Sequence, residues 1–122
     1  MANPNLIAAT SILAKTDAKL LTTSNATQLV NSSGSNKIVK IVNLNFANIS
    51  SLTVTITAQI FISSTNFTAT IAHNISIPVG ASIVLASKDN PFYLAEGDNL
   101  RASSASANSV HCSIVHETVD DA

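Results

Sequence analysis

The chain has 122 residues and a formal net charge of −1; 46% of its residues are hydrophobic and only 11% are charged. Disorder couples low hydrophobicity to high charge, so this composition predicts one folded domain with an ample core. The six Lys and Arg residues are scattered and form no basic stripe for phosphates. Every apolar stretch is broken by polar residues well before the roughly 20 needed to span a bilayer, so neither nucleic acid nor a membrane is an expected partner.

The N-terminal residues 1–24 carry apolar side chains without a clean period of either regular structure. We interpret this zone as an extended arm with short strand pieces around residues 6–13 and 18–22, followed by a domain over residues 25–122. A helix across residues 7–21 is the competing interpretation, but no apolar stripe is sustained there. An arm that cannot bury its own apolar residues gains most by packing on another subunit, through strand addition or exchange. The candidate partner-binding residues are therefore Leu6, Ile7, Ile12, Leu13, Leu20 and Leu21.

Residues 31–36 have the composition of a loop, and residues 37–48 alternate as a strand. One predicted face of this strand carries Ile38, Val42, Leu44 and Phe46. Val39 and Ile41 lie on the opposite face, so we expect both faces to be partly covered near this end of the strand.

Residues 52–77 alternate apolar and polar side chains on either side of a four-residue break at residues 63–66. A period of two places every second side chain on one face of a strand, so the segment predicts a long antiparallel hairpin with one buried face. The apolar face is predicted to contain Leu52, Val54, Ile56, Ala58, Ile60 and Ile62, then Phe67, Ala69, Ile71, His73, Ile75 and Ile77.

The C-terminal third reads as short strands at residues 81–87, 92–94, 100–103 and 109–119, separated by turns. Eight or more short strands at turn intervals of roughly 8–12 residues predict an all-β, antiparallel two-sheet sandwich, either jelly-roll or Ig-like. Because the chain has only three Gly and three Pro, Asn and Ser are expected to take the left-handed turn positions.

His111, Cys112 and His116 invite a zinc proposal. Neighbouring residues on a strand face opposite ways, and residues four apart on a strand lie about 13 Å from each other, so these side chains cannot share one ion. Cys112 is better interpreted as a small core residue, and His73 as a buried or interface histidine with a hydrogen-bond partner.

Acidic residues cluster near two turns, at Asp89-Asn90 and at Glu96-Gly97-Asp98. They offer the oxygen ligands of a calcium site, but acidic residues in turns commonly cap the backbone, and we expect no metal and no cofactor. Because no nucleophile is paired with a base and no phosphate-binding loop is present, we do not expect an enzyme.

Residues 77–101 combine the turn Pro78-Val79-Gly80 with a strand, then Tyr93-Leu94, Glu96-Gly97-Asp98 and Leu100-Arg101. Together with the opening Met1-Ala2-Asn3-Pro4-Asn5 and with Lys15-Thr16, this pattern resembles small β-sandwich virion proteins of tailed bacteriophages, particularly marine and cyanobacterial ones. The resemblance implies a non-enzymatic structural role in a virion and brings no catalytic residues.

The function we expect is that of a capsid decoration (cement) protein, which binds the major capsid protein and clamps neighbouring capsid subunits. The uncharged polar residues are largely Ser, Thr and Asn, and a surface of hydroxyls and amides can be covered by a neighbour with little charge desolvation. We further expect a homo-oligomer, with a trimer favoured. It would be synthesised in the host cytoplasm and located on the capsid surface. The alternatives are a neck, tail or fibre component and a carbohydrate-binding host-recognition module.

Overall fold

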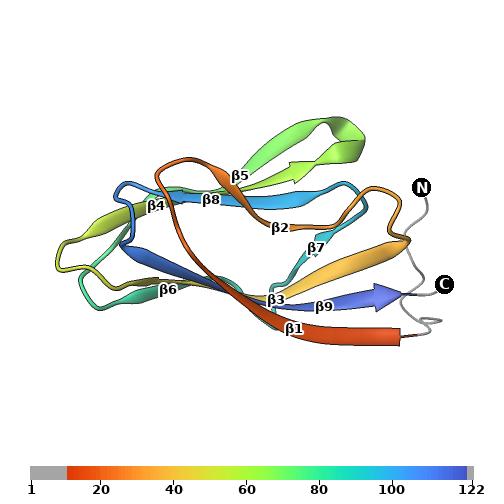
Figure 1. Cartoon of the computed structure of the whole chain (residues 1–122), viewed down its shortest axis with the longest axis horizontal. Helices are drawn as coiled ribbons and strands as arrows, with labels where there is room; N and C mark the ends of the chain where they lie inside the picture. Colours follow the sequence, from red (N-terminus) through yellow and green to blue (C-terminus); the bar gives the residue numbers. More distant parts are fainter. Residues whose placement is uncertain (1–10, 121–122) are drawn as a thin grey trace.

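The computed structural model describes residues 11–120, which form two antiparallel β-sheets packed face to face (Figure 1). In chain order the strands are β1 (Ser11–Leu20), β2 (Ala26–Val30), β3 (Lys37–Asn48), β4 (Val54–Ile62), β5 (Phe67–Ile77), β6 (Ser82–Ala86), β7 (Phe92–Leu94), β8 (Asn99–Ser104) and β9 (Val110–Asp120). A 3-10 turn, η1 (Ser63–Thr65), joins β4 to β5. The described part contains no helix long and apolar enough to cross a membrane.

The strand order identifies the sandwich as a jelly roll. One sheet has the order β1-β9-β3-β6, with β7 also pairing with β3, and the other has the order β2-β8-β4-β5. The chain therefore changes sheets between β1 and β2, between β2 and β3, and again between β3 and β4, which is the double Greek key of jelly rolls. The predicted sandwich is confirmed, and its topology is the jelly roll rather than the Ig-like alternative, in which consecutive strands more often share a sheet.

The inner faces of both sheets form one continuous apolar core, with side chains from nearly every strand meeting between the layers. Burial of these side chains at about 25 cal/mol per Å² of apolar surface is the main stabilising term for a domain of this composition. The largest fully buried side chains are Phe46, Leu21, Ile41, Leu44, Ile56, Ile77, Leu94, Leu100, Ile114, Val110 and Cys112.

The predicted hairpin is present as β4 and β5, but its second strand departs from simple alternation. The register between β4 and β5 shifts twice, between Ile56 and Ala58 and between Ala58 and Gln59. Asn74 takes a left-handed conformation with φ of 49° inside the first irregularity. The bulge reverses the facing of the next residues, so Ala72 is buried while His73 is exposed. The prediction that His73 lies on the buried face is therefore wrong.

The facing predicted for β3 needs the same kind of correction. The pairing of β3 with β9 shifts between Ile41 and Asn43, which leaves Val42 as an extra residue. Val39 and Ile41 therefore join the core with Leu44 and Phe46, rather than facing the opposite way.

Two further segments differ from the sequence-based expectation. Residues 11–20 form one unbroken strand, not two short pieces, and residues 26–30 form β2, which was not predicted. The expectation for the turns is confirmed for asparagine. Apart from glycine, the left-handed residues of the described chain are Asn36, Asn66, Asn74 and Asn108.

Candidate assembly surface

The first strand leaves one side of its backbone unpaired within the described residues. β1 pairs with β9 through consecutive residues from Ser11 opposite Asp120 to Leu20 opposite His111, with no shift of register. It is the outermost strand of its sheet, as the red strand at the lower edge of Figure 1 shows. An exposed strand edge presents free N–H and C=O groups to another strand. We call this free side of Ser11–Leu20 the β1 edge.

The other sheet edges carry features that discourage pairing. β2 is five residues long and shifts register between Thr27 and Leu29. β5 has the two irregularities described above. On the far side of the first sheet, β6 has five residues and a register shift, and β7 has three residues. Short edges and bulges are the usual protection against strand addition, so the β1 edge is the long, regular edge of the described sandwich.

Both faces of β1 are largely exposed, and of Ile12–Leu20 only Asp17 is partly buried. The even-numbered residues of β1 face outward, on the same side of the sheet as His111 and Ser113 of β9. The odd-numbered residues of β1 face the inner side, together with the core residues Cys112 and Ile114 of β9. The outward set is Ile12, Ala14, Thr16, Ala18 and Leu20. The inner set is Leu13, Lys15, Asp17 and Lys19.

The candidate partner-binding residues fall into three groups. Ile12, Leu13 and Leu20 lie on β1 and are 57%, 66% and 42% exposed, so they are free to contact a partner. Leu21 is completely buried in the core and belongs to the sandwich itself. Leu6 and Ile7 lie outside the described residues. The structure thus brings half of the predicted set to the β1 edge.

A partly buried polar contact, which sequence reasoning missed, holds β1 to the sheet. Asp17 Oδ2 and His116 Nε2 are 2.8 Å apart, and the His116 side chain is almost fully buried. The hydrogen bond from His116 lowers the pKa of Asp17, and the positive charge of Lys15, whose Nζ is 3.7 Å from Asp17 Oδ1, acts in the same direction. No local motif announces a pair separated by 99 residues.

Acid should weaken this contact. A carboxyl whose pKa is lower in the folded chain stabilises the fold above its unfolded value of 3.8 and loses that contribution as the pH falls through the folded value. We expect Asp17→Asn to lower the free energy of unfolding by about 1 kcal/mol at neutral pH, with the difference from the unmodified chain shrinking below pH 3.8. Urea unfolding of both chains from about pH 7 to about pH 2.5 measures this difference in the free energy of unfolding. The exposed-turn variant Asp89→Asn controls for the loss of a negative charge, and a difference independent of pH would contradict the assignment.

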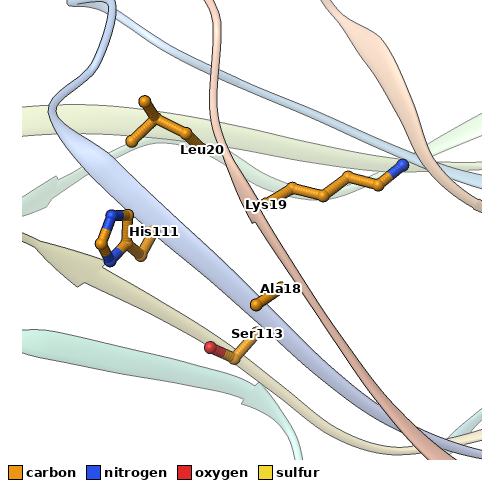
Figure 2. Close-up of a pocket in the computed structure, with 5 residues that line it drawn as sticks. All are labelled: Ala18, Lys19, Leu20, His111 and Ser113. Atoms are coloured by element: carbon orange, nitrogen blue, oxygen red, sulfur yellow. The ribbon is translucent and has the colours of Figure 1, made fainter.

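Three shallow hollows adjoin β1. Their volumes are about 220, 230 and 180 Å³, below the roughly 300 Å³ at which small-molecule pockets begin. The first is lined by Ala18, Lys19, Leu20, His111 and Ser113, and Figure 2 shows Lys19 reaching away from Leu20, His111 and Ser113. Such surfaces suit contact with another protein better than enclosure of a ligand.

The carboxylates of the turn Glu96-Gly97-Asp98 accept structural hydrogen bonds. Asp98 is buried, and its carboxylate accepts backbone N–H groups from Ser63 at 2.9 Å and from Ala95 at 3.0 Å. Glu96 Oε1 accepts the backbone N–H of Asn36. Within residues 11–120 no three acidic, histidine or cysteine side chains gather as they would around a metal ion. The carboxylates of Glu96 and Asp98 cap backbone groups, as expected of acidic residues in turns.

Cys112 lies in the core, as predicted, and burial raises the pKa of its thiol to about 12. Since the thiolate is the reactive form, Cys112 should be inert in the folded protein. We expect a thiol reagent to label it at least about a hundredfold more slowly than in urea-unfolded chain at neutral pH. Labelling followed by mass spectrometry measures this ratio, with Ser113→Cys as a more accessible control on the outward face. Rapid labelling of native Cys112 would show that the strand opens.

The comparisons with known proteins show the fold. No protein-family model matches the sequence, and no curated protein sequence is significantly similar. A chain from Bacillus endospore appendages, described as a novel family of disulfide-linked pili, superposes with a TM-score of 0.50 at 12% identity, covering 98% of this chain and 93% of that one. At this identity the likeness shows a common fold across the whole subunit.

Two viral particle structures are also similar. The T13 particle of IBDV gives a TM-score of 0.48 at 12% identity, with 91% of this chain and 31% of the viral chain covered. The Gt strain of infectious bursal disease virus gives 0.44 at 12% identity, with coverages of 89% and 32%. This chain therefore spans under a third of each viral chain's length.

Proposed function

We propose that this chain is a non-enzymatic structural subunit of a virion, specifically a capsid decoration protein that binds the major capsid protein and clamps neighbouring shell subunits. The observation that carries the proposal is the β1 edge, a regular ten-residue strand left open on one side while the other edges are short or bulged. Jelly rolls serve repeatedly as virus shell domains. The surface location, the oligomeric form and synthesis in the host cytoplasm are parts of the same proposal.

The exposed apolar residues of β1 support an assembly role. Ile12 and Leu13 together expose side chains on both faces of the strand, and a single chain gains nothing from keeping them in water. Packing against a neighbour removes this surface, while added backbone hydrogen bonds supply direction. The N-terminal residues, Leu6 and Ile7 included, are proposed to extend the same contact.

A filament subunit is the second candidate, favoured by the match over the whole length of the appendage chain. The disulfide linkage named for those pili cannot be transferred, because Cys112 is the single cysteine of this sequence and it is buried. Assembly of this chain through its described residues would therefore not depend on disulfides. A neck, tail or fibre component and a carbohydrate-binding module remain alternatives. For the carbohydrate-binding module, Phe67 and Tyr93 are exposed aromatic residues of the described chain.

The deciding experiment counts copies of the chain in purified particles by quantitative mass spectrometry, relative to the most abundant shell protein. A simple ratio to the shell subunit is the result expected of a decoration protein. A few copies per particle would indicate a neck or tail component. Absence from particles, together with its recovery in a fibre fraction, would favour the filament and overturn the virion proposal.

A further inference from the structure

We propose that the β1 edge is occupied by the β1 edge of a second copy of this chain, in an antiparallel pair with a two-fold axis at Thr16. This inference deepens the proposed function, because it rests on the proposal that the edge is used in assembly and names a second copy, rather than the shell protein, as the partner there. The shell protein would then contact other surfaces of the pair. The pair would join the two first sheets into one continuous sheet, which is the self-complementary contact of a two-fold dimer.

The sequence of β1 is self-complementary about Thr16. Across the outward face, Ile12 meets Leu20 of the second copy and Ala14 meets Ala18, so the two exposed apolar side chains cover each other. Thr16 meets its own counterpart, a pairing that is favourable between strands. These residues all belong to the exposed outward set of β1.

The inner face is complementary in charge. Lys15 of each copy lies opposite Asp17 of the other, which gives two ion pairs related by the axis. Asp17 Oδ2 is held by His116, whereas Oδ1 contacts only the long and exposed Lys15 of its own chain at 3.7 Å. The contact with His116 thus orients the carboxylate so that Oδ1 can accept a hydrogen bond from the second copy's lysine.

The two neighbouring registers of the strand pair bring like charges together. Shifting the axis by one residue toward the N-terminus places Lys15 opposite Lys15, and shifting it by one toward the C-terminus places Asp17 opposite Asp17. Like charges directly opposite each other destabilise a strand pair. The charges therefore exclude these two registers. A register centred on Ala18 would also place Asp17 opposite Lys19, but it would pair only residues 16–20 of β1, whereas the register centred on Thr16 uses nearly the whole length of the strand.

On the inner side of β1, Leu13 and Lys19 are exposed. Asp17 and Lys19 also border a shallow hollow that they share with Thr27–Val30 of the second sheet. A two-fold strand pair makes a dimer, which differs from the trimer expected from the sequence, because three copies cannot share one antiparallel edge.

Disulfide trapping tests both the partner and the register in the full chain. Opposite residues in an antiparallel pair have Cα atoms about 4.5–5.5 Å apart, within the range that a disulfide spans. Under mild oxidation, Thr16→Cys should give a covalent dimer about tenfold faster than Ala14→Cys or Ala18→Cys alone, because pairing raises the effective thiol concentration. A mixture of Ala14→Cys and Ala18→Cys chains should also cross-link efficiently. The buried Cys112 provides a background check in the unmodified chain.

Native mass spectrometry of the unmodified protein accompanies the trapping. A dimer with selective Thr16→Cys trapping supports the inference. Equal cross-linking of all three single variants, a trimer, or a monomer at every concentration would overturn it. If the protein is monomeric yet present on particles in a simple ratio to the shell protein, the self-pairing fails while the decoration function stands. If it dimerises as described but is absent from particles, the function fails and the pairing stands.

Discussion

Replacing Leu21 with alanine should lower the free energy of unfolding by about 3 kcal/mol, whereas the same change at the adjacent Leu20 should cost less than about 1 kcal/mol. Leu21 is completely buried among core residues, and its backbone N–H donates to the carbonyl of Val110 at 2.9 Å. Truncation leaves a cavity that the surrounding strands fill only in part. Urea unfolding followed by circular dichroism measures both variants.

Leu20 provides a matched control, because it is the same residue type one position earlier in the chain and is 42% exposed at the end of β1. Its truncation removes surface that water already reaches, so the fold should be retained while assembly is weakened. Equal destabilisation by the two substitutions would mean that the first strand lies differently against the sandwich. The pair is a cleaner test than deleting residues 1–24 would be, since such a deletion removes Leu21 from the core together with the proposed contact surface.

Replacing Asp98 with alanine should also cost about 3 kcal/mol, although the side chain is polar. Its carboxylate ties the β4–β5 turn to the β7–β8 turn through the backbone N–H groups of Ser63 and Ala95. Removal leaves two partly buried donors without partners, and each costs roughly 1–3 kcal/mol. Thermal and urea unfolding at neutral pH provide the measurement.

Two further variants sharpen this result. Asp98→Asn keeps one acceptor oxygen and should lose about half as much stability as Asp98→Ala. Asp89→Ala changes an exposed residue of a nearby turn and should lie within about 0.5 kcal/mol of the unmodified chain. If calcium raised the free energy of unfolding of the unmodified chain but not of Asp98→Ala, the carboxylate would be a metal ligand and the capping assignment would be wrong.

The period-two pattern of residues 54–62 was sufficient to predict strand β4 and the residues it buries, because consecutive side chains on a regular strand must alternate between faces. Leu52, which was assigned to the same face, precedes the strand and is 72% exposed. The same rule failed at His73 and at Val42, where one extra residue in the strand reverses the facing of its neighbours. A bulge leaves little trace in composition. Asn74 is a usable signal in retrospect, since asparagine tolerates the left-handed conformation found there.

The candidate surface was only partly predictable. The apolar residues of the N-terminal zone suggested contact with a partner, but the pattern alone assigned Leu20 and Leu21 the same role. In the structure Leu21 is completely buried, whereas Leu20 is exposed. The contact between Asp17 and His116 could not be foreseen, because it depends on β1 lying beside β9 at the opposite end of the chain.

By itself, the sequence determined the all-β class, the positions of most strands and turns, and the absence of a local motif for chemistry, since each of these depends on residues close together in the chain. Only the tertiary structure decided the jelly-roll order, the facing of side chains beyond each bulge, and which sheet edge stays open. Strand order and edge exposure depend on pairings between segments far apart in sequence, and no local propensity encodes them.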